Sequence, residues 1–113
     1  MSISISSRKA KSRNLQNKIV EELLKKFPHF DSNDIKPAIM GESGIDVKLS
    51  NPARKEFPFA IEAKNQESLS IWSALEQCEE NAKLEKLTPL LIFKRNRSDI
   101  YVTLKFEDFI KLI

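Results

Sequence analysis

The 113-residue sequence is poor in cysteine, histidine and glycine, and the scarcity of the first two limits the kinds of disulfide and metal site that it can form. The single cysteine, Cys78, cannot form an intrachain disulfide, and with only one histidine, His29, it cannot complete a zinc cluster. A metal ion would therefore have to be bound by oxygen atoms. Both glycines, Gly41 and Gly44, fall in the stretch GESG, which predicts a turn with an unusual backbone conformation.

Long hydrophobic runs are also absent. No stretch approaches the roughly 20 apolar residues that a membrane span needs, and the N-terminus has no hydrophobic signal region, so we expect a cytoplasmic protein without a membrane partner. Apolar residues make up 41% of the sequence and include seven phenylalanines, enough for one hydrophobic core. The length suits a single domain.

Positive charge is in modest excess, with a net charge of +3, but it is unevenly placed. The stretch SSRKAKSR, residues 6–13, is basic, and so is FKRNRS, residues 93–98. Two readings remain open from charge alone: solvated surface segments, or contacts with phosphate groups. We expect residues 1–12 to form a flexible basic arm and residues 13–113 to form the domain.

Hydrophobic periodicity predicts an α/β fold, with helices flanking a mixed β-sheet, in the order α-β-β-β-α-β-β-α. The predicted helices span residues 13–27, 69–87 and 107–113, and the predicted strands span residues 34–40, 45–49, 59–64, 89–94 and 100–105. The expected buried face of the second long helix comprises Trp72, Leu75, Cys78 and Ala82. His29 follows Pro28 and is expected in a loop.

Charged residues interrupt two of the predicted strands. Glu62 and Lys64 are two positions apart, so they point to the same side of their strand, and Asp46 can face the same volume if the two strands pair. Two carboxylates that face each other repel unless a cation lies between them, and Mg²⁺ prefers such oxygen ligands. Lys64 would then orient an attacking water or hold a phosphate. The alternative is a salt bridge on a solvated sheet face.

Four stretches together resemble the PD-(D/E)XK nuclease superfamily, in particular small phage-type Holliday junction resolvases. The matching stretches are RNLQNKIVEELLKKFP, MGESGIDVKLS, FPFAIEAKNQESLSIWSALEQCEENA and TPLLIFKRNRSDIYVTLKFEDF. The resemblance covers most of the chain and implies a restriction-endonuclease-like core. It also implies phosphodiester hydrolysis that depends on Mg²⁺, with Mn²⁺ able to substitute.

The resemblance assigns roles to individual residues. Asp46 and Glu62, with Ala63 between the motif residues, are implied to hold the metal ion, and Lys64 is implied to be the catalytic lysine. Ile45 replaces the proline of the family motif, which leaves the carboxylate unchanged. Related proteins often have a glutamate in the first helix where Gln16 stands, so Gln16 either contributes to the site or is a buried amide with its own partner.

Further candidates have open alternatives. Ser43 either contacts a phosphate or stabilises its turn, and Gln77 is either functional or a helix-surface amide. Asn65 and Gln66 either reach the cleaved strand or cap the next helix. Trp72 is expected in the core rather than stacked on a base. The expected phosphate contacts are Lys9, Lys11, Arg13, Arg95 and Arg97.

The expected function is a Mg²⁺-dependent DNA endonuclease that acts on branched DNA such as four-way junctions, as a homodimer because two strands need two active sites. If a phage encodes it, it would act in the host cytoplasm and in DNA recombination. Two alternatives remain: a general or nicking nuclease for duplex or single-stranded DNA, and a non-catalytic DNA-binding accessory protein. RNA is also an open substrate.

Overall fold

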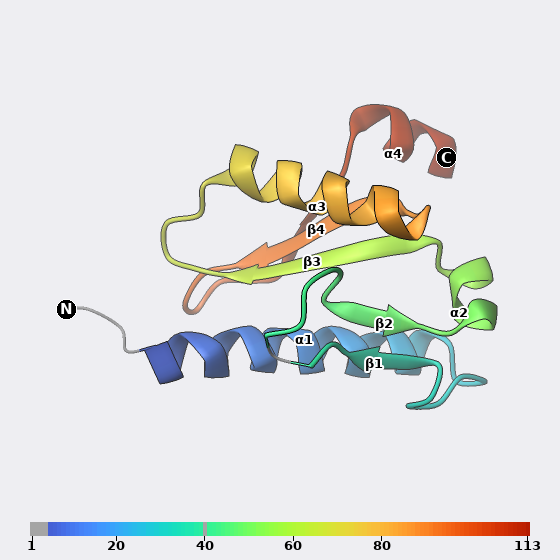
Figure 1. Ribbon diagram of the computed structural model, residues 1–113, viewed down its shortest axis with the longest axis horizontal. Coiled ribbons are helices and arrows are strands. Elements are labelled where there is room, and N and C mark those ends of the chain that lie inside the picture. Colours follow the sequence, from blue (N-terminus) through green and yellow to red (C-terminus); the bar gives the residue numbers. More distant parts are fainter. Residues whose placement is uncertain (1–4, 40) are drawn as a thin grey trace.

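The computed structural model describes residues 5–39 and 41–113, and its elements alternate between helices and strands (Figure 1). The helices are α1 (Ile5–Lys26), α2 (Asn51–Glu56), α3 (Ile71–Glu85) and α4 (Phe106–Leu112). The strands are β1 (Ile35–Pro37), β2 (Val47–Leu49), β3 (Phe59–Asn65), β4 (Thr88–Lys94) and β5 (Tyr101–Thr103). In the part of the chain that the structure describes, no helix is long and apolar enough to cross a membrane.

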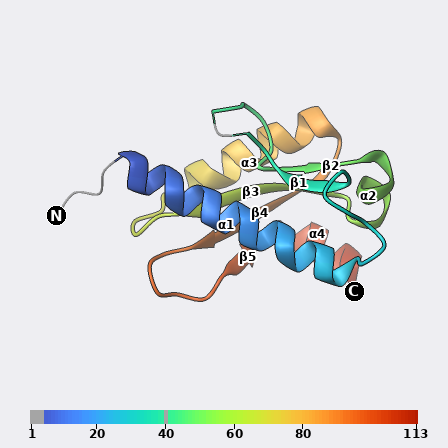
Figure 2. The same cartoon turned by 90° about the horizontal axis from the view of Figure 1, so that it is seen from below.

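The central sheet has the order β3-β4-β5, and a separate antiparallel pair, β1-β2, lies next to β3. β3 and β4 run parallel, whereas β4 and β5 run antiparallel. Helix α1 covers one face of the sheet and α3 the other (Figure 1), and β5 forms the edge farthest from β1 and β2 (Figure 2). The predicted mixed α/β sheet flanked by helices is confirmed, and it is compatible with a restriction-endonuclease-like core.

Alternation along β3 and β4 divides the core into two layers. Ile61 and Ile92 belong to the cluster that packs against α1, while Leu91 packs with Ala74 and Cys78 of α3. Because helices cover both faces of these two strands, every position along their middle is buried, as is usual for parallel strands. A charged residue in the middle of β3 is therefore placed inside the protein.

The buried face of α3 consists of small residues, and the expectation for Trp72 is wrong. Ala74, Cys78 and Ala82 are buried at intervals of four residues, whereas 78% of Trp72 is exposed. Each residue turns a helix by about 100°, so Trp72, two positions before Ala74, points almost to the opposite side. The small side chains let α3 lie close to the sheet. Leu75 is partly buried, as part of the same layer.

Helix α1 begins at Ile5 rather than near residue 13, so most of the segment expected as a flexible arm is helical. Residues 1–4 lie outside the described part of the chain. The sequence of this segment has no apolar periodicity that would reveal a helix, but arginine, lysine and alanine have high helix propensity and no glycine or proline interrupts them. Lys9 and Lys11 are therefore carried on a helix.

The short helix α2 occupies a segment that the sequence reading assigned to a loop. Ser50 is its N-cap and accepts a hydrogen bond from the Ala53 backbone N–H, and Pro52 stands in the first turn, where the missing N–H costs nothing. Arg54 pairs with Glu85 at the end of α3 at 2.5 Å. This helix fixes the connection between β2 and β3.

Candidate active site

Asp46 is held in place by its backbone and by its side chain. Its N–H donates to the carbonyl of Ile61 at 2.9 Å, and its Oδ2 accepts from the N–H of Ala63 at 2.7 Å. It lies just before β2, after a turn in which Gly41 and Gly44 adopt φ angles of 88° and 105°. These are left-handed conformations in which a side chain would be strained. The turn and β3 together set the position of the carboxylate.

Glu62 and Lys64 share one side of β3, as their spacing predicts. Lys64 Nζ lies 3.9 Å from Glu62 Oε1. Glu62 is only 3% exposed, which contradicts the alternative of a salt bridge on a solvated sheet face. The lysine side chain is about one-quarter exposed, so its ammonium group reaches from the interior toward solvent.

The three motif residues line one pocket of about 330 Å³ between α1, residues 38–39 and 41–44, and α3. Its lining includes all the residues that the sequence singled out for catalysis or metal binding, and two of those expected to contact DNA. The first group is Gln16, Asp46, Glu62, Ala63, Lys64 and Gln77, and the second is Ser43 and Gln66. This arrangement agrees with the prediction that these residues lie together. Their roles in catalysis and binding stay predictions.

Burial of the two carboxyl groups changes their protonation. Burial raises the pKa of Glu62 to about 8, and the negative charge of Asp46 adds to the rise while Lys64 opposes it. Burial also raises the pKa of Asp46, against the opposing effect of the Ala63 N–H and of Lys64. The pair therefore favours retaining a proton near neutral pH unless another positive charge takes its place.

Unpaired oxygen atoms mark the same pocket. Among the described residues, Gln16 Oε1 and Glu62 Oε2 are buried and have no hydrogen-bond partner. Buried polar atoms in folded proteins almost always have a partner, so these two oxygens are free to bind a water or a cation, or, for Glu62, to share a proton with the Asp46 carboxyl group. The atoms of Gln16, Asp46 and Glu62 that could bind a cation are oxygen atoms of carboxyl and amide groups, the type that Mg²⁺ and Mn²⁺ prefer.

The donor set for a cation contains two carboxylates. No group of three or more His, Cys, Asp or Glu side chains suitable for a metal occurs within the described ranges 5–39 and 41–113. A Mg²⁺ ion usually binds through one or two carboxylates and keeps several waters, so Asp46 and Glu62 suffice. Because an alanine side chain has no donor atom, Ala63 could contribute only its backbone carbonyl.

Gln16 projects into this region from α1. It is 6% exposed, and its unpaired Oε1 does not fit the reading of a buried amide whose carbonyl has its own partner. An amide oxygen is a weaker ligand than a carboxylate and carries no charge. Gln16 is therefore suited to accept a hydrogen bond from a water in the pocket.

Two polar residues on the helices that line the pocket were missed by sequence reasoning. Asn81 donates from Nδ2 to the carbonyl of Gly44 at 3.2 Å, and so ties α3 to the glycine turn. Ser12 lines the pocket one helical turn before Gln16. Helical spacing could have found both, because Asn81 lies four residues after Gln77 and Ser12 four residues before Gln16.

Other predicted residues lie outside this pocket. Asn65 follows Lys64 in β3, and its buried Oδ1 has no partner among the described residues. The predicted phosphate contacts outside the pocket are Lys9, Lys11 and Arg13 on α1, and Arg95 and Arg97 in the turn after β4. His29 lies in the turn after α1, as expected, with Nε2 2.8 Å from Glu56 Oε2.

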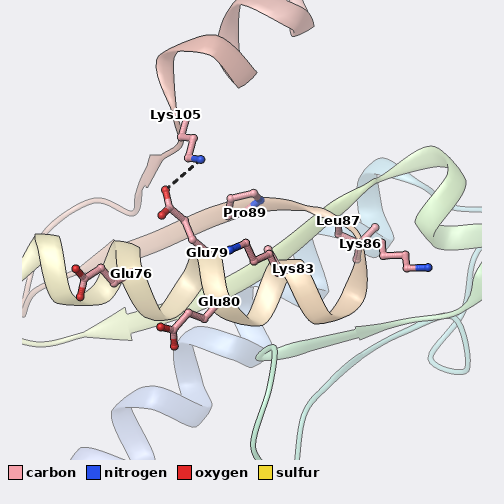
Figure 3. Close-up of a pocket in the computed structure, with 9 residues that line it drawn as sticks. Glu76, Glu79, Glu80, Lys83, Lys86, Leu87, Pro89 and Lys105 are labelled. Carbon is pink, nitrogen blue, oxygen red and sulfur yellow. Dashed lines mark ion pairs between the residues drawn. The ribbon is translucent and has the colours of Figure 1, made fainter.

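A larger hollow of about 680 Å³ lies on the outer side of α3, beneath α4 (Figure 3). Glu76, Glu79, Glu80 and Lys83 project from the helix there, and Lys105 Nζ lies 3.6 Å from Glu79 Oε1. These side chains are wholly or partly solvent-exposed, so none of them is a buried carboxylate like Glu62 in the pocket of about 330 Å³. The smaller pocket is therefore the candidate active site.

Comparison with known proteins gives one family. Residues 38–113, about two thirds of the chain, match the model of the family described as "Phage putative PDDEXK endonuclease". Asp46, Glu62 and Lys64 all fall within the matched residues, while Gln16 precedes them. No curated protein and no solved structure matches the chain. The chain therefore belongs to this phage PDDEXK endonuclease family.

Proposed function

We propose that the protein is a Mg²⁺-dependent DNA endonuclease that hydrolyses phosphodiester bonds in the pocket of Asp46, Glu62 and Lys64. The observation that carries the proposal is the carboxylate pair of buried Glu62 and partly buried Asp46 beside a lysine, in a chain that belongs to an endonuclease family. Keeping two like charges buried destabilises a protein unless a cation compensates them. A protein that only bound DNA would have no need of this arrangement.

The residues of the pocket would have different roles in hydrolysis. Asp46 and Glu62, with the Ala63 carbonyl, would hold the cation, which supplies Lewis-acid polarisation of the phosphoryl group and neutralises its developing charge. Lys64, whose ammonium group is partly exposed, is placed to orient the attacking water or to bind the phosphate that is cut. Gln16 and Gln77 line the same space and supply hydrogen-bonding amides.

Binding of DNA is proposed to rest mainly on phosphate contacts. The N-terminal part of α1 and the turn between β4 and β5 lie at the same end of the molecule (Figure 1). These two segments carry Lys9, Lys11, Arg13, Arg95 and Arg97. We assign Ser43, Asn65 and Gln66 to closer contacts with the cleaved strand. Affinity that comes from phosphates should fall steeply as salt rises.

Branched DNA, such as a four-way junction, is the proposed preferred substrate, and two copies are proposed to act together. One pocket per chain cuts one strand, so symmetric cutting of two strands needs a second copy. None of the pocket residues is an obvious reader of base sequence. Selectivity for DNA shape therefore fits the site better than selectivity for sequence.

Incubation of the protein with labelled four-way junction, flap, duplex and single-stranded DNA tests the proposal. Cleavage is expected with Mg²⁺ or Mn²⁺, fastest on the junction, and is expected to stop in excess chelator, because both carboxylates need the cation to act. Ca²⁺ serves as a control for binding without the same chemistry. Salt-dependent DNA binding without cleavage under any of these metal conditions would instead indicate an accessory DNA-binding protein.

A further inference from the structure

Helix α4 carries an apolar stripe that its own chain does not cover. Phe106, Phe109, Ile110 and Ile113 recur at three- and four-residue intervals, which places them on one side of the helix. Their exposed fractions lie between 46% and 85%, and none of the α4 residues is buried in the part of the chain that the structure describes. A helix of seven residues is only marginally stable without packing, so this stripe calls for a partner surface.

An apolar groove of about 320 Å³ lies on the opposite face of the sheet. Its floor and walls include Ile19, Leu23, Phe57, Ile61, Ile100 and Val102. Val102 of the edge strand β5 is 57% exposed, so α1 covers this side of the sheet only in part. The ion pair between Lys18 and Glu22, at 2.9 Å, lies along the rim.

The helix does not fill the groove of its own chain. Helix α4 lies beyond α3, whereas the groove lies on the α1 side of the sheet (Figure 3). Only Leu104 and Lys105 connect β5 to α4, and the pairing of Lys105 with Glu79 holds the start of the helix on the α3 side. The stripe and the groove of one copy are thus two apolar surfaces that do not meet each other.

We propose that two copies of the chain associate through these surfaces, with α4 of each copy seated in the groove of the other. A fully exposed aromatic side chain offers about 150–250 Å² and an aliphatic one roughly 100 Å², so the stripe with Ile100 and Val102 presents roughly 500 Å² of apolar surface per copy. A standard interface buries about 800 Å² per partner, of which about 56–65% is apolar. The available area is enough for a stable dimer.

The arrangement leaves both candidate active sites open. The pocket of Asp46 and Glu62 lies toward β1 and β2, and β5 is at the other edge of the sheet (Figure 2). Two pockets in one particle would serve the proposed cutting of two strands, and in this respect the inference rests on the proposed function. The association itself depends on the apolar surfaces alone.

Sedimentation equilibrium of the full chain, without DNA or metal, tests the association. The wild-type protein is expected to sediment at twice the 13.0 kDa of one chain. Phe109→Glu and Val102→Glu are each expected to weaken association by at least about 100-fold, since each would bury an unpaired carboxylate in an apolar contact. Leu84→Glu is the matched control, because Leu84 is 82% exposed on α3 and should leave the dimer intact.

Mixing the two variants separates this geometry from a simple contact between two α4 helices. Phe109→Glu keeps an intact groove and Val102→Glu keeps an intact stripe, so a mixture should associate more tightly than either variant alone, through the one contact that carries neither substitution. A monomeric wild type, a dimeric Val102→Glu variant, a mixture that associates no better than either variant, or an equal loss with Leu84→Glu would each overturn the proposal.

Hydrogen exchange on the wild type gives a measurement that does not depend on the folding of a variant. Amides of α4 are expected to lose protection when the protein is diluted, while those of α3 keep theirs; equal behaviour of both helices would overturn the proposal. Because no DNA is present, a dimeric but inactive protein would reject only the proposed nuclease function, and an active monomer only the association.

Discussion

Replacement of Asp46 by Asn, Glu62 by Gln or Lys64 by Met is expected to lower the rate of DNA cleavage by at least about 1000-fold, equivalent to about 4 kcal/mol of transition-state stabilisation. Each substitution keeps the size of the side chain and removes the charge that the proposed chemistry uses. DNA binding should change much less, because the proposed phosphate contacts lie on α1 and in the β4–β5 turn. Single-turnover cleavage of a labelled junction measures the rate.

Two substitutions outside the pocket serve as controls for this set. Glu76→Gln and Lys83→Met remove one charge of each sign from the exposed outer side of α3, and both variants should cleave at the wild-type rate. Circular dichroism and thermal unfolding establish that all five variants fold. If the three pocket variants cut as fast as these controls, the chemistry does not take place in the pocket of Asp46 and Glu62.

The free energy of unfolding of the metal-free protein is expected to fall as pH rises from about 5 to about 8, because of Glu62. Burial raises the pKa of Glu62 to about 8 in the folded protein, whereas the unfolded chain has the ordinary value of 4.5. Between these values the folded state holds a proton that the unfolded state has lost, so its stability is greatest at the acidic end. The loss is on the order of 3 kcal/mol, or about 10 °C in Tm.

Glu62→Gln isolates this effect, since a neutral amide at the same position has no proton to lose. The variant should unfold at a higher temperature than the wild type at pH 8 without metal, and its Tm should vary less with pH. Mg²⁺ should stabilise the wild type at pH 8 and have little effect on the variant. Differential scanning calorimetry measures how the Tm depends on pH and on Mg²⁺, with Glu76→Gln as the control. An unchanged or lower Tm for Glu62→Gln at pH 8 would contradict the claim that ionised Glu62 beside Asp46 destabilises the metal-free protein.

The helices and strands that could be predicted are those whose own short stretch of sequence indicates the structure. Alternation predicted β3, and the stretches PLLIFK, IYVTLK and EDFIKLI predicted a final hairpin around the basic turn and a short C-terminal helix; the structure has each of these elements. The pairing of Asp46 with the Glu62 strand followed from chemistry rather than from pattern. Two acidic residues and a lysine in otherwise apolar strands would each be a buried, unpaired charge unless their side chains lie close together.

Errors arose where the local pattern was ambiguous. Trp72 was assigned to the core as part of the expected buried face of its helix, but burial on α3 is decided by how close the helix lies to the sheet, and that favours Ala74, Cys78 and Ala82. The first turns of α1 carry no apolar stripe, so only helix propensity could have indicated them. In α2, by contrast, Ser50 followed by Pro52 is a recognisable helix start that the reading as a loop overlooked.

Parts of the candidate site depend on tertiary packing that no local pattern encodes. Asn81 and Ser12 come from two helices on opposite faces of the sheet, and both line a pocket beside β3, the edge strand of the central sheet. The unpaired oxygens of Gln16 and Glu62 could likewise be recognised only from three-dimensional burial. The sequence indicated the chemistry of the site, and the fold supplies its boundaries.

A crystal of the protein grown or soaked in Mn²⁺ and measured at the manganese absorption edge tests the central claim most directly. We expect an anomalous peak between the carboxylates of Asp46 and Glu62, at about 2.1–2.3 Å from their oxygens, and no such peak in the Glu62→Gln variant. Glu62 Oε2, which has no hydrogen-bond partner in this structure, would then be a ligand of the ion. A pocket free of manganese at saturating concentration, with Glu62 still buried beside Asp46, would contradict a metal-dependent site.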